Sequence, residues 1–288
     1  MTGDIRAFQI FYDEKTRASV DPDFEPLDNL INERPDWYEY WPIRNYLMQN
    51  RLDESAYYGF LSPNFGSKTG LAGKQVKDFV RQTGDADVIT FSPFPCHAAC
   101  FVNVFEHGEF FHRGLFDIAS RFFRGMDSGA ELDTLVTHSR NTVFSNFFLA
   151  KSKFWNLWKV VFDRLFESAE TRTSPLYSLL NGELAYTKEG GESKLTQMKI
   201  FIMERAVSYL LATSKDLATK NFPPFKMPVS SNFNGHLPDI VVLDALKIAF
   251  SETGEPYFFQ LFRELRDKAV ASVWPGNLPW KPVGPPSG

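Results

Sequence analysis

Short apolar runs alternate with longer amphipathic stretches over the first ninety residues. The runs 7–12, 57–61 and 87–91 are rich in aromatic and β-branched side chains, and each ends at turn-forming residues. This pattern predicts three β-strands. Between them, 35–49 and 71–82 place apolar side chains at helical spacing. The strand–helix–strand order favours an α/β fold with a mostly parallel sheet and flanking helices.

The rest of the chain is predicted to be mainly helical. Residues 153–170 and 198–211 carry the strongest helical patterns, and Pro238 and Pro256 suit the first turns of two more helices. The other expected features are a polar loop at 21–29, a kink or division of the helix 35–49 at Pro42, a helix from 115, a strand at 143–149, loops at 182–193 and 222–235, and a mobile proline-rich tail at 275–288. Because the composition changes nowhere sharply, we expect one domain over 1–274.

Composition and charge exclude several classes of protein. The chain has 31 basic and 35 acidic residues among 288, a net charge of −4, which argues against a general nucleic-acid binder. Aromatic residues make up 16% of the chain, enough for a sizeable core, and two cysteines cannot form a disulfide framework. The chain begins without a secretory apolar region, and charges interrupt every apolar stretch before 18 residues. We therefore expect a cytoplasmic protein, with peripheral contact to membrane-bound machinery left open.

Polar residues follow the second predicted strand. The segment 62–68 contains Ser62, Asn64 and, at its end, Lys68, whose ammonium could meet a phosphate group. Ligands gather at the carboxyl ends of parallel strands, so this position favours a binding loop. An ordinary strand-to-helix loop with a solvated lysine is the alternative. Ser92, after the next strand, could line the same edge.

One acidic segment and one cysteine-containing segment are weak candidates for a metal site. Asp85 and Asp87 flank one alanine in a D-x-D pattern that could bind Mg²⁺ or Mn²⁺. The pattern precedes a strand rather than following one, so a polar turn is the better interpretation. Cys96 and Cys100 lack a second ligand pair at zinc spacing, so we expect two small buried thiols.

Two further segments combine charge with apolar surroundings. Segment 33–44 mixes aromatic rings with both signs of charge, and its Arg44 could pair with phosphate oxygens or belong to a packed helix with local ion pairs. Glu204 and Arg205 lie between apolar residues of a predicted helix. Burial would raise the pKa of Glu204 and suit a general base, and a structural carboxylate–guanidinium pair is the alternative.

Six segments together carry a resemblance to a known family. They are FQIFYDEKTR, RPDWYEYWPIRNYL, YYGFLSPNFGSKTG, DVITFSP, VFSNFFLAKSKFWNLW and MKIFIMERAVSYLL. In this order they resemble the bacterial glycosyltransferases of capsule and O-antigen gene clusters, which are of the GT-A, nucleotide-diphospho-sugar transferase type. The likeness covers roughly residues 5 to 215. It implies a GT-A-like, Rossmann-like sheet with a nucleotide-binding part at about 1–95 and a helical acceptor part at about 96–274.

The resemblance implies an activity and roles for particular residues. The expected reaction moves a sugar from a nucleotide-sugar donor to a polysaccharide or lipid-linked glycan acceptor. Among its residues, the segment around Asn146 resembles the family's element before a helix of the acceptor region, and Glu204-Arg205 resembles the "ERL" helix of the related family. The roles we assign are nucleotide contact by Tyr12 and Asp13, phosphate contact by Arg44, Lys68 and Arg205, substrate contact by Ser62, Asn64 and Asn146, and general-base catalysis by Glu204.

One departure from the family leaves the cofactor open. Where GT-A enzymes place their acidic metal motif, this chain has Ser62-Pro63-Asn64 or Ser92-Pro93. The enzyme then works without Mn²⁺ or Mg²⁺, or Asp87 lies differently from the prediction, or activity has been lost. A non-catalytic carbohydrate- or partner-binding protein on a degenerate transferase fold is therefore the main alternative. An unrelated α/β enzyme, such as a hydrolase, is the third possibility.

Overall fold

The computed structural model describes residues 3–126, 130–187 and 193–274. They form two compact units. Unit 1 takes its described residues from Met1–Pro93, Val143–Phe162 and Asp216–Pro228. Unit 2 takes its described residues from Phe94–Thr142, Asp163–Lys215 and Val229–Gly288. The expectation of one domain over 1–274 stays a prediction.

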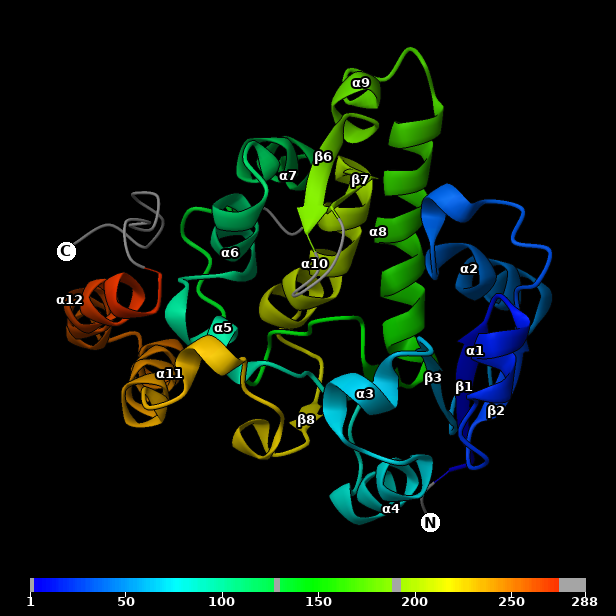
Figure 1. Cartoon of the computed structure of the whole chain (residues 1–288), viewed down its shortest axis with the longest axis horizontal. Coiled ribbons are helices and arrows are strands. Elements are labelled where there is room, and N and C mark those ends of the chain that lie inside the picture. Colours follow the sequence, from blue (N-terminus) through cyan, green and yellow to red (C-terminus); the bar gives the residue numbers. More distant parts are fainter. Residues whose placement is uncertain (1–2, 127–129, 188–192, 275–288) are drawn as a thin grey trace. The chain divides into compact units, whose positions relative to one another are not determined.

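A six-stranded, mostly parallel sheet forms the centre of unit 1 (Figure 1). In sheet order its strands are β2 (Glu25–Asp28), β1 (Ile5–Phe11), β3 (Tyr57–Leu61), β5 (Phe148–Ala150), β4 (Val88–Thr90) and β8 (Thr219–Asn221). β1 is parallel to β2 and β3, and β4 is parallel to β8. β5 is antiparallel to both of its neighbours, β3 and β4. The predicted α/β class with a mostly parallel sheet is confirmed.

Helices cover both faces of this sheet. They are α1 (Glu14–Ala18), a 3-10 helix (Pro35–Trp37), α2 (Tyr40–Gln49), α3 (Phe65–Thr69), α4 (Gly73–Thr83), the first part of α8 (Ser152–Glu170) and a second 3-10 helix (Pro224–Lys226). All five residues of β3 are buried, as is typical of a strand with both faces covered. On one face Phe65, Val76 and Val80 join the core with Ile89 and Phe91.

The other face of the sheet is covered by packed aromatic rings. Phe60 stacks on Phe8 with ring centroids 5.3 Å apart and meets Trp155 of α8 edge-on at 5.0 Å. Further along α8, Trp158 stacks on Phe162 at 4.1 Å. Aromatic pairs in these geometries contribute about 0.5–1.5 kcal/mol each beyond their buried area. The aromatic content seen in the sequence is thus largely core.

Unit 2 is mainly helical and has its own core. Its helices are α5 (Pro95–Cys100), α6 (Val104–Phe111), α7 (Leu115–Arg124), the end of α8, α9 (Tyr177–Leu180), α10 (Met198–Thr213), a 3-10 helix (Ser231–Phe233), α11 (Leu237–Thr253) and α12 (Pro256–Val273). β6 (Glu183–Thr187) and β7 (Ser193–Gln197) form an antiparallel pair. α11 and α12 lie side by side and pack on α5 (Figure 1). Within the described residues, no helix is both long enough and apolar enough to cross a membrane.

The strong periodic patterns are confirmed by the structure. Strands occur in the predicted runs, and helices occupy 152–170 and 198–213. Pro238 and Pro256 lie in the first turns of α11 and α12. The predicted helix at 35–49 is divided into a 3-10 helix (Pro35–Trp37) and α2, and Tyr38 between them has a φ angle of 48°. The division comes before Pro42, which lies in the first turn of α2, where its missing N–H breaks no hydrogen bond.

Weaker patterns gave wrong expectations. The predicted loop at 21–29 contains β2, whose short, half-exposed edge strand lacks an apolar run. The predicted strand at 143–149 begins only at Phe148 and runs to Ala150, because Ser145 and Asn146 have positive φ angles that a β-strand does not contain. The predicted loop at 182–193 contributes β6 and the first residue of β7, and helices α5 and α6 precede the expected helix from 115. The predicted mobile tail lies outside the described residues.

Candidate functional site

The order of the strands creates a topological switch point in unit 1. β1 lies between β2 on one side and β3 on the other, so the chain reverses its direction of travel across the sheet at β1. In open α/β sheets, ligands bind outside the carboxyl ends of the strands at such a switch point. Tyr12 follows β1 there, and Ser62 follows β3. We call the polar residues at these strand ends the carboxyl edge.

Tyr12 and Asp13 lie directly before helix α1, and Asp13 is its N-terminal cap. The Asp13 carboxylate accepts hydrogen bonds from the backbone N–H of Thr16 at 2.6 Å and from the Thr16 hydroxyl at 2.7 Å, which caps α1. These hydrogen bonds lower the pKa of the Asp13 carboxyl. The Tyr12 side chain is 45% exposed. Asp13 therefore has a structural task, and Tyr12 presents a ring that a flat ligand could stack on.

Gln9 connects the loops on either side of the switch point. It is buried in β1, and its amide Nε2 donates to the backbone carbonyls of Ser62 and Pro63 at 3.4 Å. Its Oε1 accepts from the backbone N–H of Asp21 at 2.8 Å. Ser62 is buried as well, whereas Asn64 is exposed at the start of α3. Gln9 was not a predicted site residue, since a single glutamine in an apolar strand carries no motif.

Lys68 joins the carboxyl edge to a distant turn. From α3, its Nζ donates to the hydroxyl of Ser145 at 2.9 Å, across 77 positions in the sequence. Ser145 lies just before β5, and β5 runs antiparallel to β4, so its start lies beside the carboxyl end of that strand. The Ser92 hydroxyl, after β4, accepts from the backbone N–H of Phe144 at 3.0 Å. Hydroxyls from two loops and one ammonium thus meet at this edge.

The turn before β5 contains two residues with positive φ angles and a buried oxygen without a hydrogen-bond donor. Ser145 and Asn146 have φ angles of 58° and 54°. Left-handed residues other than glycine cost about 1–3 kcal/mol each and cluster at functional sites. The Oδ1 atom of Asn146 is buried and accepts no hydrogen bond. Such an atom costs about 1–3 kcal/mol, which a hydroxyl or N–H of a bound ligand would relieve.

Arg44 lies on α2 beside an aromatic ring. Its guanidinium carbon is 5.6 Å from the ring centroid of Trp41, and Arg34 lies at the same distance from that ring. Arg34 also binds the Asp36 carboxylate with two hydrogen bonds of 2.9 Å. The predicted mixture of aromatic rings and local ion pairs is therefore present. A phosphate contact by Arg44 stays a prediction.

The candidate metal carboxylates lie at the other end of the sheet and are engaged in ion pairs. Asp85 pairs with Lys151, and this hydrogen bond lowers the pKa of Asp85. Asp87 accepts from Lys153 at 3.2 Å and from the backbone N–H of Ala218 at 2.9 Å. Both precede β4 and so lie at its amino end. In the described part of the chain, no three His, Cys, Asp or Glu side chains gather as metal ligands would.

Glu204 and Arg205 belong to unit 2. The Arg205 side chain is 5% exposed and donates to the backbone carbonyls of Val104 at 3.0 Å and Phe201 at 2.7 Å. The Glu204 side chain is 44% exposed and lies 3.8 Å from the Arg205 guanidinium. These contacts match the structural alternative for Arg205. The roles of Glu204 as a base and of Arg205 as a phosphate ligand stay predictions.

Neither a family model, nor a curated protein, nor a solved structure matches this chain.

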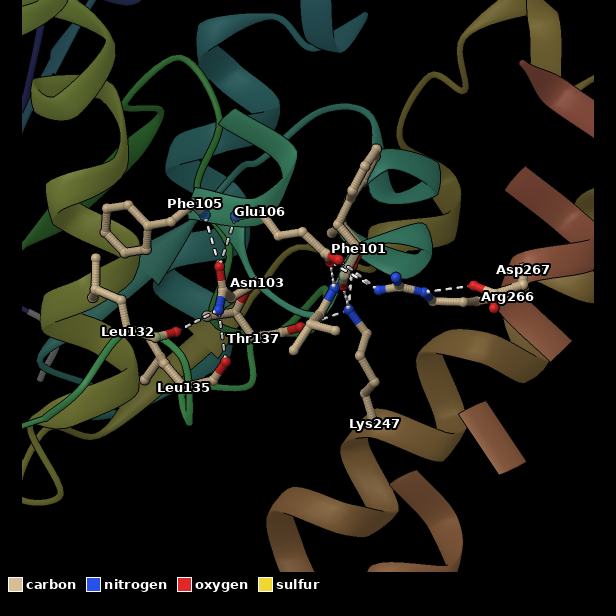
Figure 2. Close-up of polar contacts among 12 residues, drawn as sticks. Phe101, Asn103, Phe105, Glu106, Leu132, Leu135, Thr137, Lys247, Arg266 and Asp267 are labelled. Atoms are coloured by element: carbon tan, nitrogen blue, oxygen red, sulfur yellow. Dashed lines mark hydrogen bonds and ion pairs between the residues drawn. The ribbon is translucent and has the colours of Figure 1, made fainter. Parts of the chain in front are cut away.

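A second polar assembly is buried within unit 2 (Figure 2). Lys247 of α11 is fully buried, and its Nζ donates to the backbone carbonyls of Ala98, Phe101 and Thr137. Burial lowers the pKa of Lys247 to about 8. Nearby, Arg266 of α12 donates to both carboxylate oxygens of Glu106 at 2.9 Å. Because these groups satisfy one another, the assembly holds α5, α6, α11 and α12 together rather than presenting a reactive group.

A chain of histidines crosses the same unit. Arg205 Nη2 lies 3.5 Å from His107 Nδ1. His107 Nε2 lies 3.1 Å from His97 Nδ1, and His97 Nε2 lies 3.0 Å from the Ser230 hydroxyl. Burial lowers the pKa of His97 to about 4, so this ring is neutral at pH 7.

Proposed function

We propose that the protein is a glycosyltransferase of the GT-A type, which transfers a sugar from a nucleotide-sugar donor to a polysaccharide or lipid-linked glycan acceptor. The donor would bind at the carboxyl edge of unit 1. The observation that carries the proposal is the meeting of Lys68, Ser145 and the open Asn146 acceptor at the switch-point end of the sheet. A cytoplasmic location is part of the same proposal.

Each of these groups has a task that the reaction requires. As the glycosidic bond to the nucleotide breaks, negative charge develops on the leaving diphosphate. The Lys68 ammonium, half-buried against the Phe147 ring, would stabilise that charge. Asn146 Oδ1 would accept a hydroxyl of the donor sugar, and the exposed Tyr12 ring would stack on the base. Ser62 and Asn64 would complete the wall of the site.

Donor binding is tested by the thermal stability of the purified full chain. UDP-, GDP-, CMP- and dTDP-sugars are added singly, with and without Mn²⁺. A donor at 100 times its dissociation constant stabilises the fold by about 2.7 kcal/mol. We expect one nucleotide class to raise the melting temperature. In Lys68→Ala and in Asn146→Ala, the same rise should require at least ten times the donor concentration. Lys77→Ala, on α4, is the control and should behave as the unmodified protein.

Turnover separates an enzyme from a binding protein. If Glu204 is the base that accepts the proton of the acceptor hydroxyl, Glu204→Gln lowers the rate of sugar transfer at least 100-fold while donor affinity stays nearly unchanged. Equal rates of sugar transfer in Glu204→Gln and in the unmodified protein would contradict the role of Glu204. Donor binding without transfer to any glycan acceptor would favour the non-catalytic alternative, and no binding by any donor would contradict the whole proposal.

A further inference from the structure

A hollow of about 280 Å³ lies in unit 1 at the amino end of β3. It is formed by the end of α2, the segment 51–54 that leads into β3, and the first two turns of α8. Ser62 and the carboxyl edge lie at the other end of the same strand. The hollow is therefore separate from the site proposed above for the donor.

Apolar and polar side chains line the hollow, and we call the polar ones its rim. Leu47, Leu52 and Trp155 are the apolar ones. The indole N–H of Trp155 already donates to the backbone carbonyls of Tyr58 at 3.2 Å and Ala150 at 3.1 Å, so it serves the fold and not a ligand. The rim carries hydroxyl, amide and charged groups from Asn50, Arg51, Glu54, Ser152, Asn156 and Lys159.

The charge of the rim favours an anion. Arg51, from the segment before β3, and Lys159, from α8, both line the hollow, and Glu54 is the one carboxylate among its lining residues. Arg51 is exposed and makes no ion pair with any residue that the structure describes, whereas other arginines of unit 1 do pair with a carboxylate: Arg6, Arg17, Arg34 and Arg81. The carboxylate of the nearby Asp53 is occupied by the N–H and hydroxyl of Ser55.

We infer that this hollow binds a small anion of monosaccharide size, such as a sugar phosphate or a sugar carboxylate. Drug-sized and cofactor ligands occupy pockets of about 300–1,000 Å³, so the hollow suits one sugar ring with its charged group and not a nucleotide sugar. Arg51 and Lys159 bind the phosphate or carboxylate. The amides of Asn50 and Asn156 bind ring hydroxyls. The inference goes beyond the proposed donor site and does not depend on it.

Calorimetric titration of the full chain tests the inference. Glucose 1-phosphate and glucuronate are the two charged probes, and glucose is the neutral control. We expect one or both charged probes to bind more tightly than glucose. Arg51→Gln and Lys159→Gln should each weaken that binding about five-fold, the loss expected for one ion pair in water. Both side chains are exposed, so the variants should fold, and Lys77→Gln is the matched control.

The outcomes distinguish this site from the donor site. Binding that survives Lys68→Ala and is not displaced by a nucleotide sugar supports the second site. Binding that Lys68→Ala abolishes, and that Arg51→Gln and Lys159→Gln leave intact, places the anion at the carboxyl edge and overturns the inference without contradicting the donor proposal. No heat of binding from either charged probe at millimolar concentration also overturns it.

Discussion

Asn146 combines two features that are unfavourable in the folded protein. Its backbone is left-handed, with φ at 54°, and its buried Oδ1 accepts no hydrogen bond. Residues that lower stability in this way are typical of sites where binding requires a group to be held ready.

Replacing Asn146 by glycine should therefore stabilise the protein. Glycine adopts positive φ without strain and leaves no open acceptor, so we expect the free energy of unfolding to rise by about 1 kcal/mol. Urea denaturation of the full chain measures it. Asn64→Gly is the matched control, since Asn64 has φ of −85° and should gain nothing. A loss of stability in Asn146→Gly would contradict the interpretation, and donor binding should weaken in the same variant.

The site residues differ in how far the sequence could predict them. Lys68 and Ser62 were predicted because they follow an unmistakable strand, and carboxyl ends of strands bind ligands. Gln9 and Ser145 were missed, because their contacts cross 53 and 77 positions and leave no local pattern. The two aspartates before β4 were expected to form a polar turn, and the ion pairs there agree with that expectation.

Helix α6 depends on one side chain at its start. Asn103 is buried, and its Oδ1 accepts from the backbone N–H groups of Phe105 and Glu106 at 2.9 Å. Its Nδ2 donates to the carbonyls of Leu132 and Leu135 at 2.8 Å (Figure 2). Asn103 thus caps the helix and also fixes the loop 132–135 of unit 2 against it.

Removing this cap should cost more than removing an exposed one. Asn103→Ala loses the cap, worth about 1 kcal/mol, and leaves two carbonyls without their donor, so we expect a total loss of about 3 kcal/mol in unfolding free energy. Asn103→Ser keeps an acceptor for the helix and should lose less. Asp13→Ala, which removes the exposed cap of α1, is the comparison and should cost about 1 kcal/mol. Equal losses in Asn103→Ala and Asp13→Ala would show that the loop contacts contribute nothing.

Pairing partners decided the elements that the patterns missed. β2 has the short sequence EPLD and is a strand because its backbone pairs with β1 from Phe8 to Phe11. β5 is three residues long and lies between β3 and β4, although it follows both in the sequence. Such strands are specified by hydrogen bonds to distant segments, which local propensity does not encode.

Across the whole molecule, buried histidines couple stability to pH. Burial lowers the pKa of His97 to about 4, and the pKa values of His112 and His138 to about 3. Their ordinary value in the unfolded chain is about 6.5. Between these values the unfolded chain binds more protons than the folded one, so stability is complete above pH 6.5 and falls as the pH decreases toward the folded values.

We therefore expect the protein to be less stable at about pH 5.5 than at about pH 7.5. Each histidine held neutral should contribute about 1.4 kcal/mol to the difference, and most carboxylates do not titrate in this window. Urea denaturation at both pH values measures it. In His97→Asn, the difference in unfolding free energy between the two pH values should be smaller by about 1.4 kcal/mol, whether or not the substitution changes stability at pH 7.5. Unchanged stability across this range would contradict the assignment.

Local patterns in the sequence are sufficient for the elements whose apolar positions repeat with the period of a helix or a buried strand. These include β1, β3, α8 and α10, and from their order the α/β class. That information is local, since one face of an element must be apolar wherever it packs. No local pattern shows that β5 runs antiparallel to β3, that Lys68 binds Ser145, or that Lys247 and Arg266 are buried. Those features depend on contacts between distant segments, whose free energy is shared by both partners and is visible in neither segment alone.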